Sequence, residues 1–431
     1  MNTKSAMLQT ETQVFIPEDL ISQIISSLPV KSLVRFKCVS NFWNTLIDDP
    51  TFVKLHLKKS KSSPNKQFTL ITNHVKPSVG RDWSIIPYPI SSLVDNPSAT
   101  FVADSHYLLN LKDKDWSMAG SCNGLICLVG YRFTSTANKL QDYWLRIWNP
   151  ATRKISRNIG HFCDVRDFGF RGFVFSFGWD DSTGTFKVVA SRSIDHGYTT
   201  EMRVFAIGDN VWRNIESLQV RLLGMEWCGQ RVDKGYEYGC VFLNTTFNWL
   251  AVQNWARVIV RHNWSYNWSY YVSDITVEDL VIVSLDLGTE TYNKYRLPRG
   301  FFDKLPRKEP TIGVLEECLC LCYSYKETDI VIWQMKKFGV EESWILFLKI
   351  SYNILQLDYD VSFLPLFLSK DGDTLVLCSS KNEAAILYNL RDNSMRQIEV
   401  RAHKTNIDDG TYNSLYLSLA QRYVESLISV C

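Results

Sequence analysis

The sequence predicts an α+β protein of two parts, a small N-terminal module of three helices followed by an all-β propeller of six or seven blades. Helical spacing of apolar residues is confined to the first 60 residues or so, and short strands separated by turn residues fill most of the remainder. Within the β stretch one unit of strands recurs loosely. We expect domains at 13–57 and 67–431, joined by a basic linker at 58–66.

The first helix is predicted between Pro17 and Pro29. Pro17 suits the first helical position, and Glu18 and Asp19 suit the positive end of a helix dipole. Apolar residues then recur at helical spacing: Leu20, Ile21, Ile24, Ile25 and Leu28.

Two further short helices follow, one dominated by Leu33 and Val39, the other running through Trp43 until Asp49-Pro50 breaks the pattern. A module of about 45 residues is too small to enclose all of these apolar side chains. Some must therefore face a partner protein, or else pack on the second domain of the same chain. Periodicity does not decide between these alternatives.

The residues of the helical module resemble an F-box over its full length. The resemblance is carried by Ile16-Pro-Glu-Asp-Leu20, Ile24-Ile-Ser-Ser-Leu-Pro-Val-Lys-Ser-Leu33, Arg35-Phe-Lys-Cys-Val39, Trp43 and Leu46-Ile-Asp-Asp-Pro50. In F-box proteins this module docks on the Skp adaptor of the SCF (Skp, cullin, F-box) ubiquitin ligase, and through it on the cullin and RING subunits. The resemblance implies an interface built or supported by Pro17, Leu20, Ile24, Leu28, Pro29, Val30, Leu33, Val39 and Trp43.

The linker at 58–66 is part of a basic run from Lys54 to Lys66 that contains five lysines and no acid. No aromatic residue lies between Phe52 and Phe68, so the run lacks the stacking side chains of a nucleic-acid surface. A solvated connector is therefore favoured. The formal net charge of the chain is only +2, which gives no overall attraction to nucleic acid or to an anionic membrane.

The repeated β unit has leading strands that begin at residues 123, 187, 247, 319 and 374, with spacings of 64, 60, 72 and 55. Four-stranded propeller blades of the kelch type recur at roughly 50 residues, and loop insertions lengthen the period. Five copies, together with residues 68–116, predict six or seven kelch-like blades. A β-sandwich is disfavoured because it would need far fewer strands.

The same stretch resembles the F-box-associated domain of plant F-box/kelch-type proteins. The resemblance rests on Gly120-Ser-Cys-Asn-Gly-Leu125, Trp148-Asn-Pro-Ala-Thr-Arg153, Phe177-Gly-Trp-Asp180 with Phe186-Lys-Val-Val189, and Tyr423-Val-Glu-Ser-Leu427. Turn chemistry explains Asn149, Pro150 and Thr152, so we interpret these residues as structural.

An alternating aromatic run at residues 264–270 has two interpretations. Trp264, Tyr266, Trp268 and Tyr270 alternate, so in an extended conformation they share one face. They form either a strand packed within a blade, which is favoured, or a protruding loop that supplies aromatic anchors for a client protein.

We find no catalytic motif, metal-ligand pattern or cofactor-binding loop in the sequence, and predict a non-catalytic protein without a cofactor. Cys318, Cys320 and Cys322 share one face of a predicted strand, where buried cysteine acts as a small hydrophobe. The segment Asp180 to Gly184 is expected to be a turn and not a carboxylate pair.

Neither a membrane-spanning stretch nor the apolar region of a secretory signal is evident, so we expect the cytoplasm, the nucleus or both. The resulting prediction is a substrate-recognition subunit of an SCF-type ligase, with the helices on the Skp adaptor and the propeller on an unknown client. The alternatives are a Skp-bound scaffold without degradation, and a propeller that binds or processes a carbohydrate or another small molecule.

Overall fold

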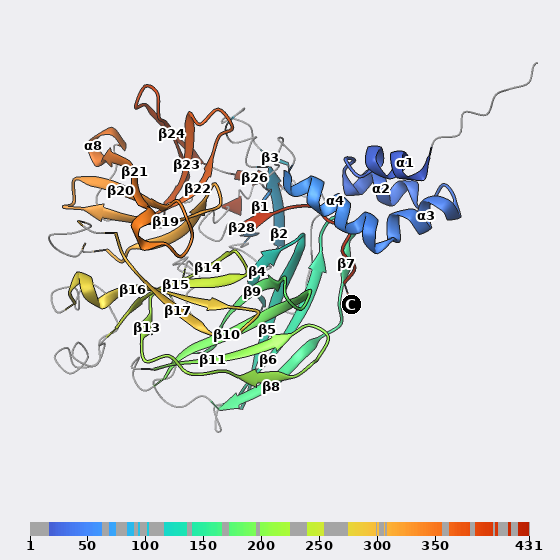
Figure 1. Cartoon of the computed structure of the whole chain (residues 1–431), viewed down its shortest axis with the longest axis horizontal. Helices are drawn as coiled ribbons and strands as arrows, with labels where there is room; N and C mark the ends of the chain where they lie inside the picture. The colour runs from blue at the N-terminus through green and yellow to red at the C-terminus, as the bar shows by residue number, and fades with distance from the viewer. Residues whose placement is uncertain are drawn as a thin grey trace, which may run out of the picture.

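The structure is a computed structural model of the 431-residue chain. It describes residues 17–62, 69–74, 84–89, 94, 101–102, 116–135, 140–165, 172–194, 199–224, 239–253, 275–298, 300, 306, 308–355, 362–379, 384–399, 401–403, 413–414 and 421–430. Figure 1 shows the helical module set to one side of a succession of β-sheets.

The N-terminal module contains four helices: α1 (Glu18–Ile25), α2 (Val30–Phe36), α3 (Asn41–Asp48) and α4 (Pro50–Ser62). The first three were predicted, whereas α4 was not. Asp49 caps α4 through its carboxylate, which accepts hydrogen bonds from the backbone N–H of Thr51 at 2.8 Å and of Phe52 at 3.1 Å. Asp49-Pro50 thus ends one helix and begins the next, and α4 extends into the segment expected to be linker.

The fourth helix helps to close the core of the module. Ile25, Leu33 and Ile47 come from the first three helices, and Phe52 of α4 packs with them at 3% exposure. A three-helix module would leave this cluster open on the side that Phe52 covers. Helix α4 therefore buries some of the apolar side chains that three helices alone would leave exposed.

The β region forms seven sheets among the described residues. Five of them consist of consecutive antiparallel strands and are as follows: β4 (Trp116–Cys122), β5 (Leu125–Ser135), β6 (Leu140–Asn149), β7 (Lys154–Ile155) and β8 (Ile159–Val165); β9 (Val174–Asp180), β10 (Thr185–Ile194), β11 (Thr199–Ala206) and β12 (Trp212–Asn214); β13 (Arg221–Leu222), β14 (Cys240–Leu243), β15 (Thr246–Val252), β16 (Leu280–Asp286) and β17 (Tyr292–Arg296); β18 (Thr311–Leu315), β19 (Cys318–Tyr325), β20 (Asp329–Met335) and β21 (Trp344–Ser351); β22 (Phe363–Leu368), β23 (Thr374–Ser379), β24 (Ala384–Asn389) and β25 (Met395–Glu399).

The remaining two sheets have three strands each and combine segments from both ends of the β region. One holds β1 (Thr69–His74), β2 (Ser84–Pro89) and β28 (Gln421–Tyr423), and the other holds β3 (Phe101–Val102), β26 (Arg401–His403) and β27 (Asn413–Ser414). A short helix, α8 (Tyr352–Leu355), and two 3-10 turns at Val277–Asp279 and Glu341–Ser343 complete the described elements.

The sequence repeats correspond to the sheets. The five predicted leading strands are β5, β10, β15, β19 and β23, which are inner members of five different sheets. Seven sheets agree with the prediction of six or seven blades. Strands β4, β9, β18 and β22, each of which precedes a leading strand, contact neighbouring sheets, as expected where blades meet around a common centre.

Neighbouring sheets share apolar cores, which hold the succession together. Leu145 of β6 packs with Phe177 of β9, and Val189 of β10 packs with Trp249 of β15. The same kind of contact joins β16 to β19 and β19 to β23. Burial of apolar area between blades is therefore the main stabilising contribution to this part of the chain.

Two of the three cysteines of β19 belong to one of these cores, as predicted, whereas Cys318 is half-buried and lies outside that core. Cys320 is fully buried and Cys322 is 2% exposed, and both pack against residues of β22 to β24. Burial raises the pKa of the Cys320 thiol to about 12, so this thiol is protonated at neutral pH.

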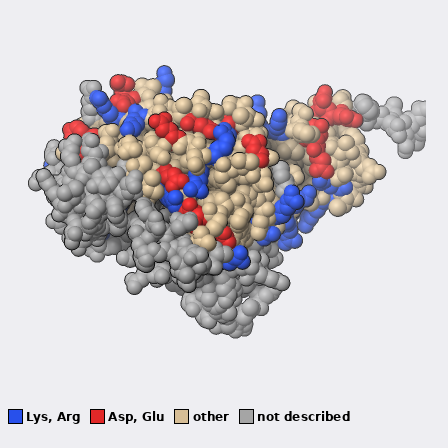
Figure 2. Space-filling view, turned by 90° about the horizontal axis from the view of Figure 1, so that it is seen from below, with Lys and Arg blue, Asp and Glu red and all other residues tan. Residues whose placement is uncertain are grey.

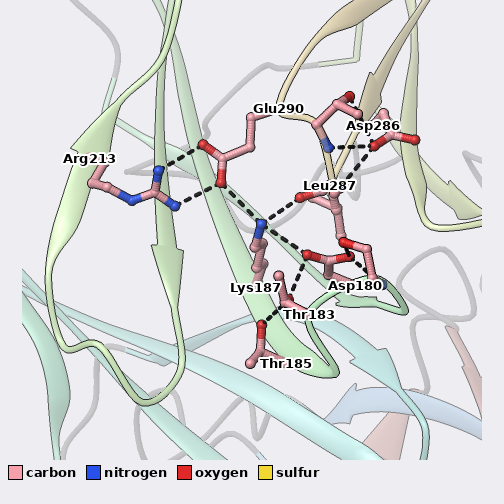
Figure 3. A network of polar contacts seen from close by, with 11 residues as sticks. Asp180, Thr183, Thr185, Lys187, Arg213, Asp286, Leu287 and Glu290 are labelled. Carbon is pink, nitrogen blue, oxygen red and sulfur yellow. Dashed lines mark hydrogen bonds and ion pairs between the residues drawn. The ribbon is translucent and has the colours of Figure 1, made fainter.

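A buried ion-pair network joins two neighbouring sheets (Figure 3). The ammonium group of Lys187 in β10 lies 3.1 Å from Asp180 and 3.0 Å from Glu290, and donates to the carbonyl oxygen of Leu287 at 2.5 Å. Glu290 stands in the turn between β16 and β17, and also pairs with Arg213 of β12 at 2.7 Å. Lys187 therefore links its own sheet to the next one.

The segment from Asp180 to Gly184 is the predicted turn. The Gly184 N–H donates to the Asp180 carbonyl at 2.9 Å, and the Asp180 carboxylate accepts from Ser182 and Thr183. Burial by itself would raise the pKa of Asp180. The hydrogen bonds from Ser182, Thr183 and Lys187 outweigh burial and hold the pKa well below its usual range.

We predict that Lys187→Met lowers the free energy of unfolding by about 3 kcal/mol, because it leaves Asp180 and Glu290 buried without their shared cation. Arg213→Met is the matched control, since the Arg213 side chain is 49% exposed and its removal should cost less than about 1 kcal/mol. Chemical denaturation of both variants measures the difference. Equal losses would contradict the role assigned to Lys187.

Candidate protein-docking surface

Exposed apolar side chains are concentrated on the helical module. Nine large hydrophobic residues are exposed in the described part of the chain, and five lie between residues 20 and 42. These five, with their exposed fractions, are Leu20 (54%), Ile24 (67%), Val34 (37%), Val39 (67%) and Phe42 (42%). Such a concentration in so small a module is typical of a surface that another protein covers.

Helix α1 presents part of this surface because it is amphipathic. Leu20 and Ile24 are one turn apart and point away from the core, whereas Ile25 is 6% exposed and packs inside the module. The carbonyl of Pro17 accepts from the N–H groups of Leu20 and Ile21 at 3.0 and 3.1 Å, which fixes the first turn. The exposed pair thus lies on a well-defined helical turn.

Aromatic packing supports the start of α3. The rings of Phe36 and Trp43 lie 5.7 Å apart, and those of Phe42 and Trp43 lie 5.5 Å apart in an edge-on arrangement. The hydroxyl of Ser40 accepts from the Trp43 N–H at 3.4 Å and caps the helix. Trp43 is half-buried, so it both supports Phe42 and contributes to the surface.

The nine residues implied by the F-box resemblance fall into three groups. Five are exposed: Pro17, Leu20, Ile24, Pro29 and Val39. Leu28 and Trp43 are half-buried, while Val30 and Leu33 are fully buried and would support an interface without touching a partner. Val34 and Phe42 are exposed but were missing from the predicted set, although their helices already showed an apolar excess.

Charge is distributed unevenly over the module. Glu18 and Asp19 open α1, next to the exposed apolar pair. On α4, Lys54, Lys58 and Lys61 are exposed at helical spacing. Figure 2 shows acidic and basic side chains gathered on different parts of the module. The apolar surface of α1 therefore has an acidic border, and the basic face belongs to a different helix.

A buried histidine joins α4 to the loop after α1. His56 is 2% exposed, and its Nε2 atom lies 3.1 Å from the carbonyl oxygen of Leu28. Nε2 must carry the hydrogen, because a carbonyl only accepts. Burial lowers the pKa of His56, while the contact with Leu28 and the charge of Glu425 act in the opposite direction without cancelling it.

The predicted client-binding residues Trp264, Tyr266, Trp268 and Tyr270 lie outside the described residues. In the part of the chain that the structure describes, no group of three or more His, Cys, Asp or Glu side chains is arranged to hold a metal ion. Nor does any described helix combine the length and apolar character needed to cross a membrane.

Comparison with known proteins agrees with both parts of the fold. The profile of the F-box domain matches residues 16–55, and that of the F-box associated beta propeller domain matches residues 81–430. Helices α1 to α3 fall within the first match and strands β2 to β28 within the second, whereas α4 extends beyond the first match and β1 lies between the two.

The chain therefore belongs to the family of F-box proteins that carry an F-box associated β-propeller domain. Among its relatives in Arabidopsis thaliana, F-box protein CPR1 is 25% identical over 400 residues, which cover 90% of this chain and 84% of CPR1. F-box/kelch-repeat protein At3g23880 is 26% identical over 361 residues, with 80% and 83% covered. Against a solved Dos1 propeller the TM-score is 0.34 at 9% identity, over 77% of this chain and 67% of that one.

We predict that the helical module loses stability as the pH falls below about 6.5, the ordinary pKa of histidine. His56 has a lower pKa when folded than when unfolded, so in this range the unfolded chain binds more protons and is favoured. Urea denaturation followed by the helical circular dichroism signal, at about pH 7.5 and about pH 5.5, measures the effect.

The control for this prediction is His56→Gln, which keeps a side-chain donor for Leu28 but does not titrate. Its stability should change less between the two pH values than that of the wild type. If both proteins lose the same amount, other groups are responsible for the pH dependence.

Proposed function

We propose that this protein is the substrate-recognition subunit of an SCF-type ubiquitin ligase. The combination of an F-box domain and a β-propeller supports a substrate-receptor role in general terms. The observation that carries the proposal is the exposed apolar surface of the F-box, above all Leu20 and Ile24 of α1. A side chain of this kind that is more than half exposed gains most when a partner removes it from water.

In this proposal the F-box binds the Skp adaptor, and the adaptor connects the protein to the cullin and RING subunits. The chain itself acts in this proposal as a non-catalytic adaptor. The contribution of this chain is then proximity, because it holds a client beside a ubiquitin-conjugating enzyme and raises the effective concentration of the client lysines. These steps would take place in the cytoplasm, the nucleus or both.

The propeller would bind the client. Loops of a rigid scaffold are the part that varies most freely, and tryptophan and tyrosine are enriched among residues that dominate interfaces. Trp264, Tyr266, Trp268 and Tyr270 are the proposed client anchors on these grounds. Their alternation supports a shared face if the segment is extended.

The adaptor interface is tested with the full chain carrying Leu20→Asp and Ile24→Asp. Each change places a carboxylate on the apolar surface of α1 without entering the core of the module. We expect the dissociation constant for a purified Skp adaptor to rise about 30-fold or more, as for residues at the centre of an interface. Calorimetry or surface plasmon resonance provides the measurement.

The matched control is Leu346→Asp on β21, where the leucine is 50% exposed but lies far from the F-box in sequence and in another domain. This variant should bind the adaptor like the wild type. Leu33→Asp is unsuitable as a probe because Leu33 is fully buried, so its loss would unfold the module. Absence of adaptor binding by the folded wild type would overturn the proposed function.

A further inference from the structure

The last described residues of the chain, 424–430, lie between the F-box and the propeller. We call this segment the strap. In Figure 1 it leaves β28, passes beside α4 and ends near β7. Its residues make contacts with both domains, and the contacts alternate along the segment.

Glu425 and Leu427 face the F-box. The Glu425 carboxylate accepts from the backbone N–H of Val30 at 3.2 Å, although the two residues are 395 positions apart in the sequence. Val30 is the first residue of α2, and the N-cap residue Pro29 offers no side-chain cap. Glu425 thus provides the acceptor and the negative charge that a helix N-terminus favours.

Leu427 packs into the core of the F-box beside residues such as Leu33 and Phe52. Among the described residues it is the one member of this cluster that comes from outside the N-terminal module. A half-buried side chain that follows the propeller in sequence therefore covers part of the F-box core.

Ser426 and Ile428 face the propeller. The side-chain amide of Asn149 is fully buried and donates to the carbonyl oxygens of Ser426 at 3.0 Å and of Ile428 at 2.9 Å. Ile428 and Val430 also pack against the core shared by the sheets of β4 and β9. The strap is therefore attached to the propeller by paired hydrogen bonds and by apolar contact.

Gly124 allows the strap to approach this closely. Its φ of +81° favours glycine, and a Cβ atom at this position would lie 2.3 Å from the Ser426 hydroxyl and 2.7 Å from the Val424 carbonyl oxygen. Three stretches quoted for the F-box-associated domain, around Gly124, Asn149 and Glu425, thus meet at one junction.

We propose that the strap fixes the orientation of the F-box on the propeller, and that Glu425 and Leu427 are positioning residues for ubiquitin transfer. Domains of one chain move relative to each other unless their interface is large and apolar. Successive side chains of an extended segment point to opposite sides, so one side of the strap contacts the F-box and the other side contacts the propeller. The role of Glu425 and Leu427 in ubiquitin transfer rests on the proposed function. The role of the strap in fixing the orientation of the F-box does not depend on it.

The orientation is tested by electron paramagnetic resonance in the full chain, as the distribution of distances between spin labels on Cys38 and Cys163. Both cysteines are exposed, one in the F-box and one in the propeller. Cys228, Cys240, Cys318 and Cys431 are changed to serine so that these two sites dominate the labelling. We expect one narrow distribution in this background, and a distribution about twofold broader when Glu425→Gln and Leu427→Ala are added.

Two control variants should keep the narrow distribution. Ser429→Ala alters an exposed residue of the strap, and Leu427→Met conserves the apolar volume in the F-box core. Gly124→Ala perturbs the strap from the propeller, because the added Cβ atom displaces Ser426 without changing a residue of the F-box core. It should broaden the distribution even if the double variant unfolds the F-box. A broad distribution in the wild-type background, or a narrow one in Gly124→Ala, would overturn the proposal.

Transfer is tested in a ligase reconstituted with Skp, cullin and RING subunits, by mapping the lysines of the propeller that become modified. With adaptor affinity unchanged, Gly124→Ala should spread modification over more lysines than the wild type does. An unchanged pattern would contradict the positioning role of the strap. Failure of the wild type to bind the adaptor would instead refute the proposed function, and the distance measurement would stand independently.

Discussion

The pairing of β28 with β1 is the constraint on which the rest of the structure depends. Residues 69–71 pair with residues 421–423, so the beginning and the end of the β region share one sheet. A second such joint is the parallel pairing of β26 with β3. Open sheet edges would otherwise remain at both ends of the succession of blades. The same pairing places Tyr423 in a core with residues of β4 to β6, and the strap that follows Tyr423 contacts the F-box.

Local pattern was sufficient to predict the elements whose physical cause is local. Apolar spacing located α1 to α3, and runs of β-branched and aromatic residues located β5, β10, β15, β19 and β23. Helix α4 was missed because Asp49-Pro50 was interpreted only as a helix end, although an aspartate followed by proline is equally a helix start. The cause of that error is local ambiguity, which the fold resolves by placing Phe52 in the core.

The sequence predicted most of the residues of the candidate docking surface, but not which of them are exposed and which are buried. Leu20 and Leu33 have the same chemistry and both fit the helical pattern, yet one is more than half exposed and the other is fully buried. In a module this small, the difference depends on how the helices pack and not on spacing alone. The contact between Val30 and Glu425 was beyond any local pattern, because it joins the two ends of the chain.

The position of the strap after the propeller in the sequence has a consequence for synthesis. The F-box leaves the ribosome before the propeller, but Glu425 at the N-terminus of α2 and Leu427 against the F-box core emerge only after strands β1 to β28. A product that stops before β28 lacks the closing strand and the strap together. The closing strand of the β region and the residues that contact the F-box thus lie within the same ten residues, 421–430, so both domains depend on synthesis of this segment.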